Sequence, residues 1–317
     1  MQVLGIIKTL EHMKLKLIIF GFLLLSVVAN AQQEAQYTQY MYNTANINPA
    51  YAGSRGVLSI LAMHRTQWVG LEGAPKTNTI TMSTPLTNRL GLGVSIVNDK
   101  LGPSDENTFS ADISYGVPTS DNFKLAFGLK ASANFFNVDF NKLNAFKKDD
   151  PINASRTNID NTFFPNVGAG IYWYSEKTYL GLSIPYMLER KYYDNDVNFT
   201  ASERMHVHVI GGYVFELSDN IKFKPSGLAK VVKGAPLQVD LSANFLFNEK
   251  FNLGAAYRWS AAVSLMAGFQ ISDSWLIGYA YDRDTTRLGN FNSGSHEIFL
   301  RYELFKNYDK VVSPRFF

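Results

Sequence analysis

Apolar residues alternate with small or polar residues along most of the chain. In the segment 109–117 the apolar parity holds Phe109, Ala111, Ile113, Tyr115 and Val117. Because successive side chains of a β-strand face opposite sides, this period of two predicts a strand. The same alternation, without a charge on the apolar parity, covers 123–130, 237–248, 251–260, 275–282 and 297–304. Weaker alternation covers 57–65, 77–86, 90–97, 165–174, 178–186, 204–216, 221–231 and 261–271. The pattern predicts about 14 strands, inside the range of outer-membrane barrels.

The connections between these strands differ in length in a regular way. Every second connection is a short turn, at 87–89, 118–122, 175–177, 218–220, 248–250 and 272–274. The connections between them are mostly longer, at 66–76, 98–107, 137–164, 187–203 and 283–294, while those near 232–236 and 260 stay tight. Short periplasmic turns and long outer loops are typical of a transmembrane barrel. We therefore predict an all-β antiparallel outer-membrane β-barrel over 57–305 and a C-terminal periplasmic tail over 306–317.

A secreted β-sandwich and a soluble lipocalin-like barrel also alternate, and they are the alternatives. In either fold the large apolar side chains would point inward and the exposed face would carry charge. Here the opposite face is dominated by Gly, Ser, Ala and Asn, which suit a crowded lumen. Aromatic residues near strand ends are expected to form girdles at the membrane interfaces: Tyr115, Trp173, Tyr186, Trp259, Trp275, Tyr281 and Tyr302.

The N-terminal region carries a processing signal. Lys14 and Lys16 precede an apolar stretch at 17–29, and Ala29-Asn30-Ala31 is the small-x-small pattern of a signal peptidase site. We predict a signal peptide over 1–31, within which 1–12 is an extension, because Met13-Lys14 is a more usual start. The segment 32–56 has few charges and several tyrosines, so it is expected to pack under the barrel in the periplasm or inside the lumen.

Composition and charge narrow the function classes. The chain is 46% hydrophobic and 14% aromatic, too apolar for disorder, and it lacks an apolar run of about 20 residues after residue 31. Its net charge is only +3 without a basic tract, so a nucleic-acid partner is unsupported. The absence of cysteine excludes disulfides, thiol catalysis and cysteine metal sites.

Catalytic and metal-binding patterns are sparse. His206 and His208 share one strand face, and a metal site there is a minor alternative to plain hydrogen bonding. The acidic clusters Asp149-Asp150 and Asp282-Arg283-Asp284 would fall in outer loops, where Ca²⁺ binding is an alternative to solvation. The sequence predicts a protein that is not an enzyme and that uses no cofactor and no metal.

The charges on the predicted lumen face are of both signs. A selective pore would concentrate one sign, whereas a mixed set can form a salt-bridged network in a filled interior. The set is Asp112, Lys124, Lys130, Lys222, Lys224, Asp240, Arg258, Asp282, Glu297, Arg301 and Glu303.

Short motifs follow one another along the chain in a family-like order. Residues 36–43 read QYTQYMYN, 48–54 read NPAYAGS, 64–70 read HRTQWVG and 73–75 read GAP. Gly91-Leu92-Gly93, Asn98-Asp99, Lys224-Pro225-Ser226, Tyr257-Arg258, 278–282 (GYAYD) and 294–298 (GSHEI) continue the series. By order and spacing the mature chain resembles the PorP/SprF family of type IX secretion and gliding-motility membrane proteins. His64 and Thr66 depart from residues that are frequent in this family.

The resemblance implies a non-enzymatic outer-membrane barrel of the type IX secretion or gliding machinery. Such a barrel binds the C-terminal domain of a large secreted adhesin or effector and supports its secretion and surface attachment. The resemblance also implies a periplasmic peptidoglycan-binding lipoprotein as a partner, besides outer-membrane lipid. The alternative is a diffusion channel or hydrophobic-substrate transporter. The sequence leaves open the identity of the cargo, whether its tail enters the lumen, and whether the system serves gliding or secretion only.

Two sets of residues are singled out. The loop aromatics Trp68, Tyr192, Tyr193 and Phe291 are candidate partner anchors, with packing on the barrel's own rim as the alternative. The resemblance marks Asn48, Pro49, Tyr51, Gly53, Gly70, Gly294, Ser295, His296 and Glu297, for which a structural role is expected more than ligand contact. Pro49 fixes φ, and Gly53 and Gly294 permit positive φ.

Overall fold

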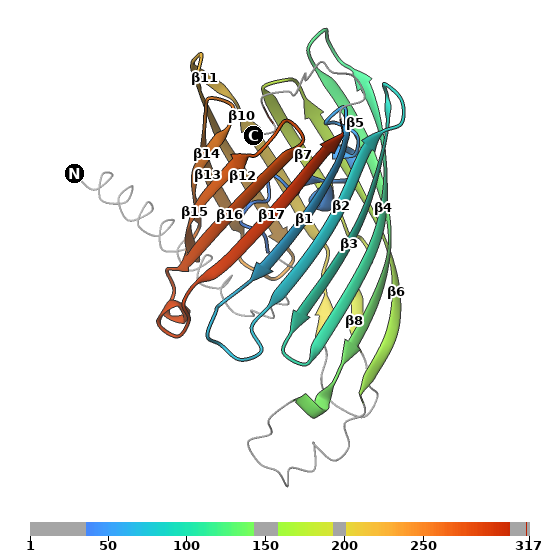
Figure 1. Cartoon of the computed structure of the whole chain (residues 1–317). Coiled ribbons are helices and arrows are strands. Elements are labelled where there is room, and N and C mark those ends of the chain that lie inside the picture. Colours follow the sequence, from blue (N-terminus) through green and yellow to red (C-terminus); the bar gives the residue numbers. More distant parts are fainter. Residues whose placement is uncertain (1–35, 143–157, 193–200, 305–314, 316–317) are drawn as a thin grey trace, which may run out of the picture.

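The computed structural model describes residues 36–142, 158–192, 201–304 and 315 (Figure 1). The predicted signal peptide therefore lies outside the described residues, as do Tyr193 and the Asp149-Asp150 cluster. In the described part, no helix is long and apolar enough to cross a bilayer.

The strands form a closed antiparallel barrel of 14 strands, as the alternation predicts. They are β1 (Leu58–Thr66), β2 (Lys76–Pro85), β3 (Leu90–Leu101), β4 (Ser104–Pro118), β5 (Lys124–Val138), β6 (Ile159–Tyr174), β7 (Thr178–Ile184), β10 (His206–Tyr213), β12 (Ile221–Val232), β13 (Gln238–Phe247), β14 (Phe251–Arg258), β15 (Ala262–Gln270), β16 (Trp275–Asp284) and β17 (Ser295–Leu304). Pairing of β1 with β17 and of β10 with β12 closes the ring.

The remaining elements are short. β11 (Phe215–Ser218) pairs with the start of β12, and β8 (Arg190–Tyr192) with β9 (Ala201–Glu203) forms a separate hairpin. The helices are α2 (Thr44–Ile47), η1 (Pro49–Tyr51), η2 (Phe140–Lys142) and η3 (Arg287–Asn290). In Figure 1 the short turns lie at the top, which we call the turn end, and the longer loops at the bottom, which we call the loop end.

The barrel is apolar outside and polar inside. Outward-facing Ile80, Leu129 and Leu265 are 54, 63 and 64% exposed, whereas inward-facing Arg65 and Asp112 are each 1% exposed. A soluble sandwich or barrel would bury the first group, so both soluble alternatives are wrong. An apolar exterior over polar, small inward residues is the pattern of a barrel in lipid.

Two predicted loops differ from the structure. The loop at 137–164 is shorter, because β6 begins at Ile159, and the loop at 98–107 is wrong. The segment 98–107 is a continuous hairpin, in which β3 and β4 stay paired up to Leu101 and Ser104. Gly102 turns the chain at φ 56°, and Asn98 Nδ2 donates to Asn107 Oδ1 at 2.9 Å across the ladder. β4, β5 and β6 have 15, 15 and 16 residues, more than the roughly 9–11 that a tilted strand needs to cross a bilayer. The polar residues of 98–107 form strands because this hairpin extends beyond the apolar band of the barrel.

Residues 36–56, which precede β1, lie inside the barrel, where Figure 1 shows them in blue. We call residues 36–56 the plug. Most of its residues are buried; Asn48 and Ala50 are 0% exposed and Tyr40 is 1% exposed. The first residue of the plug, Gln36, contacts Gln238 and Arg258 at the loop end. Near the last residue, Arg55 pairs with Glu303 at the turn end. The plug therefore runs along the lumen from the loop end to the turn end.

Candidate functional site

Glycines of the barrel wall form a cradle for the plug. A Cβ on Gly128 would collide with the backbone of Pro49 and Ala50, and a Cβ on Gly170 would collide with the side chain of Asn48. On β3, a Cβ at Gly91 would meet the carbonyl of Ala52. Residues 48–52 can approach β3, β5 and β6 this closely only because these wall positions carry no side chain.

The motif NPAYAGS folds into the turn that fits this cradle. Asn48 Oδ1 accepts from Ala50 N at 3.0 Å, and its Nδ2 donates to the Ile171 carbonyl of β6 at 3.0 Å. Pro49 begins η1, where its fixed φ suits the first helical position. Gly53 adopts φ 72°, and its N–H donates to Ser83 Oγ at 2.8 Å. A single turn of the plug thus contains or adjoins four of the family-motif residues: Asn48, Pro49, Tyr51 and Gly53.

A buried charge cluster binds the plug near its first residues, at Thr38 and Gln39. Arg65 lies 2.6 Å from Asp282 and 3.2 Å from Glu297. Glu297 accepts the backbone N–H groups of Thr38 and Gln39 at 2.9 and 2.8 Å, and the Thr38 hydroxyl donates to Asp282 at 2.5 Å. The cluster therefore joins β1, β16 and β17 to the plug and satisfies backbone donors of the plug.

Two further pairs of lumen charges form in the same manner. Asp112–Lys130 at 2.9 Å and Asp240–Arg258 at 2.6 Å are partners directly across neighbouring strands, as are Arg65 and Glu297. Cross-strand partners lie close enough for such pairing. Arg301 instead donates to the Tyr42 carbonyl of the plug at 2.6 Å. The mixed charges thus hold the wall and the plug together.

Arg315 lies at the turn end of the lumen and is 6% exposed. Its Nη2 donates to the Ser54 carbonyl of the plug at 2.7 Å, and its guanidinium lies 4.3 Å from the centre of the Tyr174 ring. Lys224 Nζ donates to the Arg315 carbonyl at 3.2 Å. A residue of the predicted C-terminal tail thus packs inside the barrel beside the plug.

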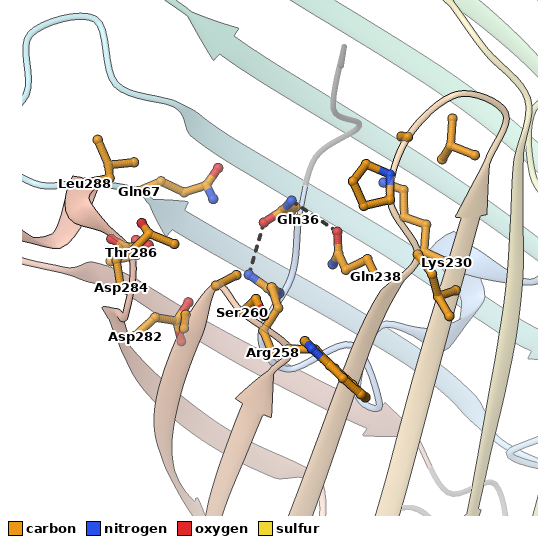
Figure 2. A pocket seen from close by; sticks show the side chains of 18 of the residues that line it. Gln36, Gln67, Lys230, Gln238, Arg258, Ser260, Asp282, Asp284, Thr286 and Leu288 are labelled. Atoms are coloured by element: carbon orange, nitrogen blue, oxygen red, sulfur yellow. Dashed lines mark hydrogen bonds between the residues drawn. The ribbon is translucent and has the colours of Figure 1, made fainter. Parts of the chain in front are cut away.

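A cavity of about 540 Å³ lies at the loop end of the lumen, where Gln36 of the plug lines it. We call it the loop-end cavity. Figure 2 shows Gln36 of the plug within it, accepting from Arg258 Nη1 at 3.0 Å and donating to Gln238 Oε1 at 3.5 Å. The remaining wall combines amides, cations and two tryptophans from the ends of several strands, including Gln67, Trp68, Arg204, Lys230 and Trp259.

Trp68 is held on this wall by the start of β17. Its backbone adopts φ 48°, unusual for a residue with a side chain, and its N–H donates to Ser295 Oγ at 3.1 Å. The next residue, Val69, donates to the Gly294 carbonyl at 2.8 Å. Gly294 adopts φ 88°, and a Cβ there would collide with Asp282 and Tyr281. Gly294 and Ser295 therefore fix the Trp68 loop, just as Glu297 anchors the plug.

The other predicted site residues are dispersed. Phe291 is 71% exposed after η3, and Tyr192 is the last residue of β8. Of the predicted anchors that the structure describes, Trp68 alone lines the loop-end cavity. His296 lies on the exposed face, with Nδ1 2.6 Å from the Tyr279 hydroxyl, and Gly70 adopts φ 101° in the Trp68 loop. Sequence reasoning missed Gln36, Arg204 and Gln238, although alternation had placed Arg258 inside.

Two of the metal alternatives, the histidine pair and the Asp282-Arg283-Asp284 cluster, fall within the described residues. His206 and His208 are both buried, with rings 6.3 Å apart. Within the described ranges, no group of three or more His, Asp or Glu side chains is placed to hold a metal ion. Asp282 is bound by Arg65 and Thr38, and Asp284 accepts from Asn292 at 3.0 Å, so these carboxylates serve the wall and the plug.

The fold and the occupied lumen define a transmembrane β-barrel filled by its own N-terminal segment. The family described as "Type IX secretion system membrane protein PorP/SprF" matches residues 29–302, and this chain belongs to it. The resemblance found in the sequence is thus confirmed. Family and fold together identify an outer-membrane protein of type IX secretion. In both respects the chain resembles non-enzymatic membrane barrel proteins.

Comparison with solved structures adds only distant likenesses. A Pseudomonas aeruginosa FadL homologue is 14% identical, with 87% of this chain and 96% of that chain covered and a TM-score of 0.43. A mutant of the TodX monoaromatic hydrocarbon channel is 10% identical, with 82% and 94% covered and a TM-score of 0.46. The KdgM porin is 9% identical, with 78% and 99% covered and a TM-score of 0.37. Likenesses this weak carry no argument about function. No curated protein matches the chain.

Proposed function

We propose that this protein binds the C-terminal domain of a large secreted surface protein or adhesin and supports its secretion and surface attachment without catalysing a reaction. Membership of the PorP/SprF family supports the link to type IX secretion. The observation that carries the proposal is the plug, which runs along the lumen and hydrogen-bonds to strands on opposite sides of it. Glu297 of β17 and Ser183 of β7 both bind plug backbone, the latter at 2.9 Å from the Ile47 carbonyl.

The plug weighs against the diffusion channel or hydrophobic-substrate transporter. Solute flow through this lumen would require displacement of a segment whose core residues are 0–8% exposed, such as Tyr40, Met41 and Ala50. A filled barrel suits attachment of a partner at the loop end better than passage of a solute. Trp68, Tyr192, Tyr193 and Phe291 are proposed as contacts of that partner at the loop end.

The test is gene deletion combined with mild-detergent purification of the tagged protein from its own outer membrane. We expect one large secreted protein to disappear from the cell surface on deletion, while other type IX cargo still exits. The same protein should co-purify with the barrel in stoichiometric amount. Unchanged surface display, or a barrel that purifies alone and conducts ions in a planar bilayer, would replace this proposal with the channel.

The purified material also tests two subsidiary proposals. We propose that the protein is exported with removal of 1–31, which the intact mass of the purified chain would report as a start at Gln32. We also propose a periplasmic peptidoglycan-binding lipoprotein as a second partner at the turn end, which mass spectrometry of the co-purifying chains would detect. A chain that retains 1–31, or the absence of any such lipoprotein, would contradict the respective proposal.

A further inference from the structure

The loop-end cavity has no surplus of charge. Arg65 in its wall lies 2.6 Å from Asp282 and 3.2 Å from Glu297, and Arg258 lies 2.6 Å from Asp240. With these partners counted, the charged side chains of the described wall balance, four cations against four carboxylates: Arg65, Arg204, Lys230 and Arg258 against Asp240, Asp282, Asp284 and Glu297. A charged ligand would find no complementary excess here, so the cavity favours a neutral polar ligand.

Gln67 supplies a buried amide that faces this cavity (Figure 2). The residue is only 7% exposed, and its backbone N–H donates to the Pro75 carbonyl at 2.9 Å. Within the part of the chain that the structure describes, no hydrogen bond engages its side-chain carboxamide. A buried amide is unfavourable unless its N–H₂ group and its oxygen find partners. The cavity is the side from which such partners can come, and they must include both an acceptor and a donor.

The backbone is strained at two positions of the cavity wall. Trp68 and Ser260 adopt φ 48° and 54°, values that are uncommon for residues with a side chain. Such strain is concentrated at functional sites, where the surrounding structure holds it in place. At Trp68 the hydrogen bond to Ser295 does so. Trp259 directly precedes Ser260 and is 66% exposed. Two indole rings therefore line the cavity, just beyond the ends of β1 and β14.

The plug closes the cavity toward the turn end. Gln36 lines the cavity, and the backbone N–H groups of Thr38 and Gln39 are bound by Glu297. A chain that enters from the loop end therefore has to stop there or turn back. A volume of about 540 Å³ falls within the roughly 300–1,000 Å³ of small-ligand sites, so it admits a chain end and not a folded domain.

The end of a saccharide chain fits these constraints better than a polypeptide does. A polypeptide end carries an α-carboxylate or an α-amino group, which is charged at neutral pH, and an internal segment would have to bring two limbs of chain into the same volume. A non-reducing saccharide end is uncharged, and each of its hydroxyls both donates and accepts, as Gln67 requires. The C–H groups of a sugar ring form an apolar face that packs against an indole ring, such as those of Trp68 and Trp259.

We propose that the loop-end cavity binds the uncharged end of a saccharide chain, with Gln67 hydrogen-bonding to its hydroxyls and with Trp68 and Trp259 packing against its rings. Lipopolysaccharide of the outer leaflet and glycans of secreted proteins both supply such ends. The inference goes beyond the proposed function and does not depend on which protein the barrel binds.

Isothermal titration calorimetry on the full-length protein in detergent tests the inference. Two probes separate the sources: the neutral saccharide fraction released by mild acid from lipopolysaccharide of the same cells, and the neutral glycans released from their secreted proteins. We expect saturable binding of one of these fractions. Its affinity should change by less than about twofold between roughly 0.05 and 0.5 M NaCl, because the site carries no net charge.

Substitutions locate the site. Gln67→Leu, which nearly keeps the volume and removes the amide, and Trp259→Leu should each weaken binding by about tenfold or more. The matched controls are Gln270→Leu and Trp275→Leu, at the turn ends of β15 and β16, which should bind as the wild type does.

Three results would overturn the inference: binding of neither fraction by the wild type, an equal loss of binding in the two controls, or binding that weakens steeply with salt. No partner protein enters this assay. Its failure therefore leaves the proposed function intact, and a barrel that purifies without a partner would defeat the proposed function alone.

Discussion

Arg65 shows how single residues hold this barrel together. Its guanidinium is buried and faces Asp282, Glu297 and Thr38, so the charges are compensated where water is excluded. A buried ion pair adds little net stability over an apolar replacement, but loss of one member leaves the other charge uncompensated. Arg65 is therefore needed to compensate the charge of the two carboxylates that face it.

Arg65→Met should lower the free energy of unfolding by about 3–5 kcal/mol, because Asp282 and Glu297 would remain buried together. Urea unfolding of the purified protein in detergent measures the change. The control is Lys100→Met, which breaks a pair with Asp105 whose lysine side chain is 55% exposed. Exposed pairs of this kind contribute roughly 0–1 kcal/mol. Equal decreases in the free energy of unfolding would show that the buried Arg65 cluster stabilises the protein no more than an exposed ion pair does.

At the level of elements, the plug and the strands depend on each other. β3, β5 and β6 carry glycines where residues 48–52 approach, although glycine weakens a strand by roughly 0.5–1 kcal/mol relative to alanine. The plug in turn uses wall groups such as Ser83 Oγ and the Ile171 carbonyl for its own hydrogen bonds. Strand stability is thus given up locally so that the plug can pack.

Gly128→Ala separates these two effects. In a strand without a plug, alanine would be favourable; against Pro49 and Ala50 it overpacks, which typically costs 1–3 kcal/mol. We expect a lower unfolding midpoint in urea for this variant. Gly116→Ala on β4 is the control, because its Cβ would meet only the Arg89 carbonyl, at 3.7 Å. A stabilised Gly128→Ala protein would mean that the plug does not pack on β5.

For the whole molecule, the barrel is closed laterally by hydrogen bonding and filled along its length by its own chain. Among the described residues, the plug begins beside Arg258 at the loop end, and Arg315 meets Ser54 at the turn end. A barrel of about 14 strands is wide enough to leave a channel unless something fills it. Under the proposed function, the filled state leaves the loop end as the place where the partner binds.

Solvent access to the plug can be measured directly because the chain has no cysteine. Thr44→Cys, on α2 at 2% exposure, should react with a polar maleimide only after the protein is unfolded. Ser120→Cys, in the exposed turn between β4 and β5, should react at once in the folded protein. Rapid labelling of both positions would show that the plug leaves the lumen readily in solution.

The sequence by itself determined the barrel, its approximate strand number, its apolar exterior and its family. These follow from local order, because side-chain alternation and turn length are properties of neighbouring residues. The strand boundaries predicted around 98–107 were nevertheless wrong, because polar residues can continue a strand ladder where a hairpin extends beyond the apolar band. The mixed lumen charges predicted a filled interior, but not what fills it.

Only the tertiary structure decided where the N-terminal segment lies and which residues surround the loop-end cavity. Closing the ring places β17 beside β1 and brings Glu297 to Thr38, a contact across 259 residues of chain. Gln36 meets Arg258 for the same reason, across 222 residues. Contacts of this separation depend on the shear and closure of the barrel, which periodicity within single strands does not specify.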